Sequence, residues 1–183
     1  MGDTLRAGTT SIAGLLEIEL AVHGDERGWF AECFQRAKLA EQGFPEFEIV
    51  QQNVSYNREI GVTRGIHAEP WDKYVTVLHG RVFAAIVDLR EGPDRGKVAT
   101  FELEPGRALY IPRGCGNSYQ TLTTDVVYSY LVNDHWSPDA QYTLIQAFDP
   151  DLGIDWPIGP DRAIRSAKDI AHPRLAELLG QQR

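Results

Sequence analysis

The middle of the chain consists of short segments rich in Val, Ile, Tyr, Phe and Thr, each bounded by Gly, Pro, Asp or Asn. Segments of this length and composition are typical of β-strands. Strands that follow one another at this spacing indicate a β-sandwich or a barrel. We predict strands at Tyr74–Leu78, Arg81–Leu89, Val98–Leu103, Ala108–Ile111 and Val126–Val132.

Helical patterns are scarce and lie at the margins of this β-rich region. One covers roughly Phe34–Gln42, and another covers roughly Pro173–Leu179, where the proline suits a first helical turn. The sequence around His79-Gly80, between two predicted strands, is typical of a β-hairpin. We therefore predict an all-β fold with short flanking helices.

Length and charge exclude several classes of protein. The 183 residues suit one domain, which we expect to span 1–183 with an N-terminal strand segment and a C-terminal helical tail. The net charge of −8 argues against nucleic-acid binding. Cys33 and Cys115 form no disulfide framework. The chain has no apolar run as long as a membrane span and no signal-peptide pattern, so we expect a cytoplasmic protein without a membrane partner.

Two gapped patterns in the chain resemble the two cupin motifs. The first, G-x5-H-x-H-x3-E-x6-G, matches the spacing from Gly61 to Gly80. The second, G-x5-P-x-G-x2-H-x3-N, falls on Gly106, Pro112 and Gly114. This resemblance implies a cupin-type double-stranded β-helix, which is a jelly-roll barrel.

The four positions that bind a metal in metal-dependent cupins are occupied here by His67, Glu69, Lys73 and Asn117. An ammonium repels a divalent cation, and asparagine is a poor ligand for transition metals. We therefore predict a barrel with no metal, in which acid–base groups stand at the metal position. A cupin that lost its metal and kept a scaffold role would show the same substitutions.

Further motifs over nearly the whole chain resemble the dTDP-4-dehydrorhamnose 3,5-epimerases, a family of metal-free cupins in deoxysugar biosynthesis. Their residues appear in the family's order and spacing. The motifs are D-x-R-G-x-F-x-E at Asp25–Glu32, Q-x-N-x-S at Gln51–Ser55, R-G-[LI]-H at Arg64–His67, K-[LY]-V at Lys73–Val75 and S-x-K-D at Ser166–Asp169.

The resemblance implies proton transfer next to the ketone of a dTDP-4-keto-6-deoxyhexose, without a cofactor. Such a reaction needs a base, a cation for the enolate oxygen and an acid on the other face. The resemblance assigns these roles to His67, oriented by Asp169, to Lys73 and to Tyr130. Tyr128 lies on the same strand face as Tyr130, and packing alone would explain either tyrosine.

The resemblance also implies a site for the nucleotide. The implied phosphate-binding residues are Arg27, Arg64 and Lys168. The other implied substrate-binding residues are Phe30, Glu32, Gln51, Asn53, Asn117 and Trp136, the last of which stands where the family usually has a tyrosine that stacks on thymine. The guanidinium of arginine suits phosphate because it pairs with two oxygens at once.

Three departures from the family leave the sugar open, and with it the choice between C3, C5 or both. Ala84 and Asn117 stand where the family usually has Asp and His, and the connection from His67 to Lys73 is short. The alternatives are a 3- or 5-mono-epimerase for an unusual deoxysugar and a non-catalytic cupin that binds nucleotide sugars. A metal-dependent oxygenase is disfavoured by Glu69, Lys73 and Asn117.

The resemblance also implies partners. A jelly roll has exposed sheet edges, which the family covers by exchanging N-terminal strands in a homodimer. The candidate segment here is Thr9–Leu20, with apolar Ile12, Leu15, Leu16 and Ile18. Arg27 and Phe30 are then expected to reach the neighbouring site. The short connection also resembles an epimerase-like domain fused to a dehydrorhamnose reductase, so we expect a separate reductase as a pathway partner.

Overall fold

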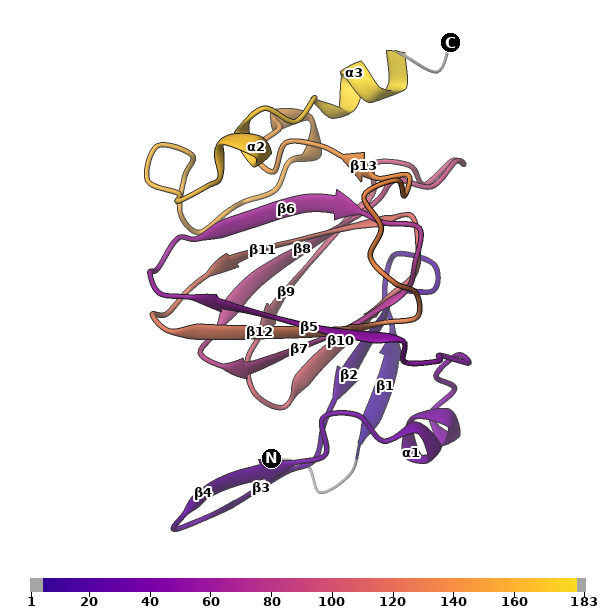
Figure 1. The fold of residues 1–183 in the computed structure, drawn as a ribbon, viewed down its shortest axis with the longest axis vertical. Helices are drawn as coiled ribbons and strands as arrows, with labels where there is room; N and C mark the ends of the chain where they lie inside the picture. The colour runs from indigo at the N-terminus through magenta and orange to yellow at the C-terminus, as the bar shows by residue number, and fades with distance from the viewer. Residues whose placement is uncertain (1–4, 181–183) are drawn as a thin grey trace.

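The computed structural model describes residues 5–180 and contains two antiparallel sheets that pack face to face (Figure 1). In spatial order, the six-stranded sheet contains β1 (Arg6–Thr9), β2 (Leu16–Glu19), β10 (Arg107–Ile111), β7 (Lys73–His79), β12 (Val126–Val132) and β5 (Gln51–Asn57). The five-stranded sheet contains β13 (Thr143–Leu144), β6 (Thr63–Ala68), β11 (Cys115–Thr121), β8 (Val82–Asp88) and β9 (Val98–Leu103). The predicted strands and the predicted jelly roll are confirmed.

The remaining elements lie at the two ends of the molecule, on either side of the stacked sheets (Figure 1). The hairpin of β3 (Val22–Asp25) and β4 (Gly28–Ala31) projects at one end, beside α1 (Arg36–Glu41). At the other end lie a 3-10 helix (Pro150–Leu152), α2 (Ala167–Ile170) and α3 (Leu175–Gly180). Both predicted helical regions are confirmed, with α3 starting two residues after Pro173. No helix in residues 5–180 is long and apolar enough to cross a bilayer.

The main core lies between the sheets because alternate residues of each strand face inward. Val75 and Val77 of β7 meet Ile86 of β8 and Leu109 of β10 there, all at most 2% exposed. Burial of such side chains is the principal stabilising contribution to a fold of this kind. The same alternation turns Lys73, two residues before Val75, toward the inside of the barrel.

A second apolar cluster fixes the C-terminal segment against the outer face of the five-stranded sheet. Ile66 and Val87 of the sheet contact Ile145, Leu152 and Leu175 of this segment. A backbone bridge between Val62 and Ile164 adds a parallel pairing to β6. These contacts place α2 beside β6.

The turn at His79-Gly80 does not form the predicted hairpin. β7 belongs to the six-stranded sheet and β8 to the five-stranded sheet, so the turn carries the chain from one sheet to the other. Gly80 has φ +80°, and a Cβ there would lie 2.6 Å from Thr123 Oγ1. Two apolar runs around a glycine look alike in sequence whether their strands pair or face each other, which explains the wrong prediction.

The segment Thr9–Leu20 is paired and packed within its own chain. β2 pairs with both β1 and β10 of its own chain. Ile12 and Leu15 are at most 1% exposed in the inter-sheet core, and Ile18 is fully buried in a cluster beside α1. The apolar side chains are thus buried within the chain, whereas β1 is an edge strand of the six-stranded sheet, and the exchange of this segment in a homodimer stays a prediction.

We expect Gly116→Ala to destabilise the protein. The new Cβ would lie 2.3 Å from Cγ2 of the fully buried Ile66 and 3.2 Å from Cδ1 of Leu89. Overpacking of this kind costs about 1–3 kcal/mol of unfolding free energy. Urea denaturation followed by tryptophan fluorescence measures the loss. Gly159→Ala is the control, because nothing lies within 4 Å of its Cβ position; equal stability of the two variants would contradict this packing.

Candidate active site

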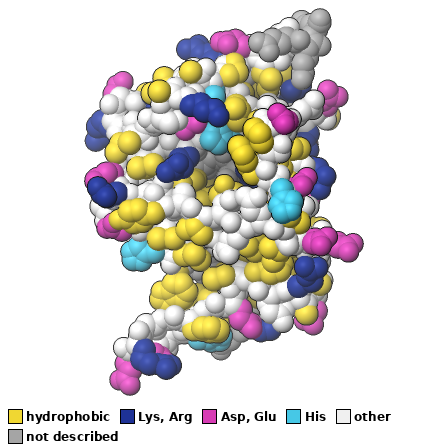
Figure 2. All heavy atoms as spheres, in the orientation of Figure 1, with side chains coloured by type: hydrophobic (Ala, Val, Ile, Leu, Met, Phe, Trp, Pro, Cys, Tyr) yellow, Lys and Arg dark blue, Asp and Glu magenta, His cyan; other side chains and the backbone are white. Residues whose placement is uncertain are grey.

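A cavity of about 530 Å³ opens between the two sheets where the segment around Ser166 covers the barrel. Figure 2 shows a hollow on this face, bordered by basic, histidine and hydrophobic side chains. The alternation of the strands directs side chains into it from both walls. The five-stranded sheet supplies His67 and Asn117, which are register partners, and the six-stranded sheet supplies Lys73 and Tyr130.

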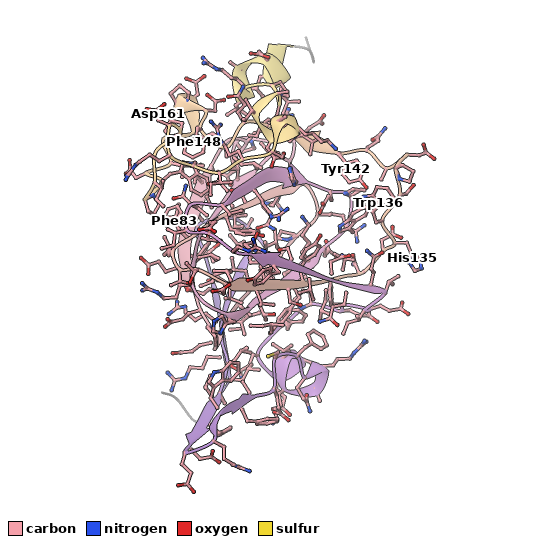
Figure 3. All side chains as sticks on the ribbon, turned by 60° about the vertical axis from the view of Figure 1, so that its left-hand side comes forward. Phe83, His135, Trp136, Tyr142, Phe148 and Asp161 are labelled. Carbon is pink, nitrogen blue, oxygen red and sulfur yellow. The ribbon has the colours of Figure 1, made fainter. Side chains whose placement is uncertain are left out.

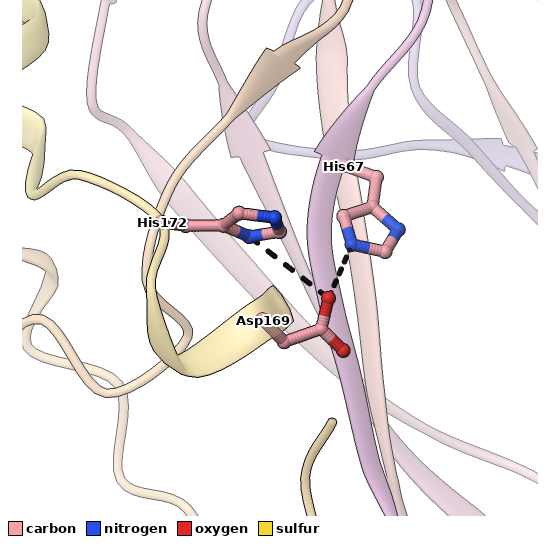
Figure 4. A group of neighbouring side chains, drawn as sticks. All are labelled: His67, Asp169 and His172. Carbon is pink, nitrogen blue, oxygen red and sulfur yellow. Dashed lines mark hydrogen bonds and ion pairs between the residues drawn. The ribbon is translucent and has the colours of Figure 1, made fainter. Parts of the chain in front are cut away.

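His67 and Asp169 form the central polar contact of the cavity (Figure 4). His67 Nε2 lies 2.9 Å from Asp169 Oδ1. A carboxylate accepts, so Nε2 carries the proton and the lone pair lies on Nδ1. The side chain of His67 is 34% exposed and lines the cavity, whereas that of Asp169 is 10% exposed. The predicted pair is therefore assembled with a free basic nitrogen.

Asp169 is held by its short helix and remains ionised. Its backbone N–H donates to Oγ of Ser166, which caps α2 at 3.0 Å. Burial raises the pKa of the Asp169 carboxyl, but its interactions, chiefly the hydrogen bond with His67, outweigh burial and hold that pKa below its usual value. A carboxylate in this state fixes the imidazole and stabilises the imidazolium that forms when His67 takes a proton.

Lys73 is nearly buried, with a side chain 5% exposed, and forms an ion pair with Glu69. Burial lowers the pKa of the Lys73 ammonium, and the adjacent Glu69 opposes that shift. The ammonium nitrogen lies 5.8 Å from the centre of the Tyr130 ring. The predicted cation and the predicted acid are therefore neighbours.

Tyr130 and Tyr128 both line the cavity, but their environments differ. Tyr130 is half-buried, and burial followed by the charge of Glu69 raises its pKa to about 12. Tyr128 is 1% exposed, stacks on Tyr119 with ring centres 4.0 Å apart, and donates to Asn117 Oδ1 at 3.2 Å. Tyr128 is thus held by packing, and Tyr130 is the more available proton donor.

Three of the predicted binding residues, on β5 and β6, are positioned by hydrogen bonds. Arg64 lines the cavity and donates from Nε to Asn57 Oδ1 at 2.9 Å. On β5, Gln51 donates to Asn53 Oδ1 at 2.8 Å and accepts from the backbone N–H of Trp136 at 3.1 Å.

A second cavity of about 340 Å³ adjoins the first, and both are lined by His67, Glu69 and Asp169. Its other residues include Lys168, Tyr142 and Trp136, whose side chain is 60% exposed. Figure 3 shows Trp136, Tyr142 and His135 along the same side of the molecule, on the segment that follows β12. Together the two cavities form an elongated site.

Arg27, Phe30 and Glu32 do not join this site in the described chain. Arg27 and Phe30 lie on the β3–β4 hairpin and Glu32 directly after it, at the end of the molecule opposite α2 (Figure 1). Arg27 pairs with Asp25, and Glu32 pairs with Lys38 of α1. Phe30 is 66% exposed.

His172 is a residue of the site region that sequence reasoning missed. Its ring packs edge-on against the His67 ring, 5.5 Å between centres, and its Nδ1 lies 3.9 Å from Asp169 Oδ1 (Figure 4). His172 is 6% exposed, and burial followed by the charge of His67 lowers its pKa. The only sequence signal was its position three residues after Asp169.

The residues at the cupin metal position do not fit a resident metal ion. Glu69 is already paired with Lys73, and Asn117 accepts from Tyr128. His67, Asp169 and His172 offer ligand atoms within 4.8 Å of one another, but the first two already share a hydrogen bond. The chemistry of the donor set therefore favours acid–base catalysis over metal ligation.

Known proteins resemble the chain over almost all of its length. A sequence profile of the dTDP-4-dehydrorhamnose 3,5-epimerase family matches residues 9–177. An RmlC homologue of Streptococcus pyogenes is 45% identical, with 91% of this chain and 87% of that protein aligned. The dTDP-4-dehydrorhamnose 3,5-epimerase of Methanothermobacter thermautotrophicus is 36% identical, with 87% and 89% aligned.

A solved structure agrees in fold. RmlC from Streptococcus suis, determined in complex with dTDP-D-xylose, is 42% identical and superimposes with a TM-score of 0.91 over 97% of this chain and 94% of that one. The sequence profile, the relatives and this structure agree with the geometry of the cavity. The chain belongs to the dTDP-4-dehydrorhamnose 3,5-epimerase family.

Proposed function

We propose that this protein is a nucleotide-sugar epimerase that acts on a dTDP-4-keto-6-deoxyhexose by removing a proton next to the ketone. The observation that carries the proposal is the placement of His67 on one sheet and of Tyr130 on the other, facing one cavity. Inversion of a carbon centre requires proton removal from one face and delivery to the opposite face. A base and an acid on opposite walls meet that requirement.

The proposed reaction uses only groups of this chain. Nδ1 of His67 takes the proton from the carbon, and the electrons of the broken C–H bond move into an enolate. Lys73 stabilises the negative charge that develops on the ketone oxygen. Tyr130 donates its hydroxyl proton to the opposite face of the carbon. Solvent then returns a proton to Tyr130 and accepts one from His67, so no cofactor or metal is consumed.

The nucleotide is proposed to lie in the adjoining part of the elongated site. Arg64 and Lys168 are the candidates for the diphosphate, and exposed Trp136 offers a face for stacking on the base. Gln51 and Asn53 supply amide groups beside that face. The S. suis relative, whose structure contains dTDP-D-xylose, supports a dTDP-linked ligand.

The projecting hairpin supports the proposal of a homodimer. It exposes Phe30 and Trp29, 66% and 49% respectively, together with Arg27, and none of its residues lines the cavity around His67. A second copy would cover these aromatic side chains and receive the arginine near its nucleotide site.

One experiment separates this function from its alternatives. Proton–deuterium exchange on dTDP-4-keto-6-deoxyglucose, followed by NMR, reports whether C3, C5, both or neither exchange. Exchange at both centres indicates a 3,5-epimerase, and exchange at one centre indicates a mono-epimerase. No exchange with retained dTDP binding would indicate a non-catalytic binding protein and overturn the proposal. The result also shows which centres react in a chain that has Ala84 where the family usually has Asp. Ala84 is fully buried on β8 and does not line the cavity.

We expect His67→Asn to abolish exchange while leaving dTDP binding nearly unchanged. The variant loses the base but keeps Arg64 and Lys168. A principal base contributes about 10²–10⁴-fold, so the rate should fall by at least about a hundredfold. Exchange rates by NMR and dTDP affinity by calorimetry provide the measurement. A loss below about tenfold would show that another group is the base.

We expect Tyr130→Phe to separate exchange from inversion. His67 still removes a proton and returns a deuteron to the same face, whereas phenylalanine has no proton to deliver to the other face. NMR should show deuterium incorporation with little epimer. Tyr128→Phe is the matched control and should invert nearly normally, because that hydroxyl is committed to Asn117. The opposite behaviour of the two variants would reassign the acid.

Mixing two inactive variants tests whether the hairpin serves a neighbouring site. In a twofold dimer with shared sites, each site uses His67 of one chain and Arg27 of the other. A mixed dimer of one His67→Asn chain and one Arg27→Ala chain therefore has one site in which both residues are intact. Random mixing after unfolding and refolding should restore about a quarter of wild-type activity. Light scattering should show a dimer at micromolar concentration. A monomer, or a mixture no more active than its components, would contradict the shared site.

A further inference from the structure

The buried ion pair between Lys73 and Glu69 gives Glu69 a role that the proposed reaction does not yet include. Within residues 5–180, Glu69 is the carboxylate that pairs with Lys73, and their side chains are 14% and 5% exposed. An isolated buried ammonium readily loses its proton, because desolvation disfavours its charged form. The charge of Lys73 therefore depends on its partner.

Glu69 is itself held in place by the turn between β6 and β7. Its Oε2 accepts from Trp71 Nε1 at 3.1 Å, and the buried Trp71 ring packs edge-on against Tyr142 at 5.8 Å. Asp72 anchors the same turn by accepting from the backbone N–H of Arg113 at 2.8 Å. These contacts hold the Glu69 carboxylate in one position, unlike a mobile side chain at the surface.

Glu69 acts on the proton donor as well as on the cation. Burial raises the pKa of Tyr130 and Glu69 raises it further; Tyr119 and Tyr142 act in the same direction, and Arg64 acts against them. Burial lowers the pKa of Lys73, and Glu69 is the group that raises it. Both residues must be protonated to do what the reaction requires, so one carboxylate favours the active form of both.

We propose that Glu69 is a positioning residue that keeps Lys73 and Tyr130 protonated and aims the Lys73 ammonium into the cavity. The inference rests on the proposed function, because it assigns a purpose to the protonated forms of those two residues. Glu69 need not touch the reacting carbon, since it acts through Lys73.

The pH profile of Glu69→Gln tests this role. Without the carboxylate, the pKa values of Lys73 and Tyr130 both fall, so the active protonated forms are lost at lower pH. We expect the alkaline limb of the pH profile of the exchange rate to shift to lower pH by about one pH unit or more. Glu69→Asp should reverse part of this shift, because it returns the negative charge on a shorter side chain. A merely structural role would lower the rate without moving the limb.

Glu102→Gln is the matched control. Its side chain is 67% exposed on β9, and it removes the same charge far from the pocket lining. It should leave the alkaline limb in place. Thermal unfolding of all three variants checks that each is folded at the pH values compared.

A second measurement does not depend on activity. NMR of protein carrying carbon-13 lysine, with the Lys73 signal assigned from Lys73→Arg, follows the titration of the ammonium directly. We expect Lys73 to titrate at lower pH in Glu69→Gln than in wild type. An unmoved Lys73 signal, or an unmoved alkaline limb, overturns the role of Glu69. Absence of exchange in wild type overturns the proposed function instead, while the NMR titration still tests the ion pair.

Discussion

The hydrogen bond between His67 and Asp169 is the constraint on which the rest of the site depends. It joins β6 to a helix 102 residues later in the sequence, at 2.9 Å. The helix α2 has only four residues, and so short a helix has little stability of its own. Ser166 caps it, and the apolar cluster that includes Ile66 and Leu175 holds its surroundings on the sheet. Packing outside the cavity therefore helps to decide which nitrogen of His67 is free.

The interior of the barrel then determines the protonation of the remaining groups. Removal of water makes charges interact more strongly than they would at the surface. Burial acts in opposite directions on the two kinds of group: it weakens proton binding by Lys73 and strengthens it in Tyr130. The carboxylate of Glu69 opposes the effect of burial on Lys73 and adds to the effect of burial on Tyr130.

The sequence predicted the barrel well because its signals are local and repeated: strand composition, turn residues and two fixed spacings. It also predicted that His67, Lys73, Tyr130 and Asp169 would meet, through resemblance to a family. The sequence-based prediction failed where the arrangement of a segment depends on contacts with residues far away in the chain. The turn at His79-Gly80 and the packing of His172 behind Asp169 were both of this kind.

The order in which the chain is made has a consequence for this architecture. The chain is synthesised from its N-terminus, and a domain generally folds as a unit. Twelve of the thirteen described strands are complete by Val132, whereas Asp169 is added 37 residues later. The base is thus synthesised before the group that orients it. The orientation of the proton acceptor therefore depends on the last segment to be synthesised as well as on the strands of the barrel.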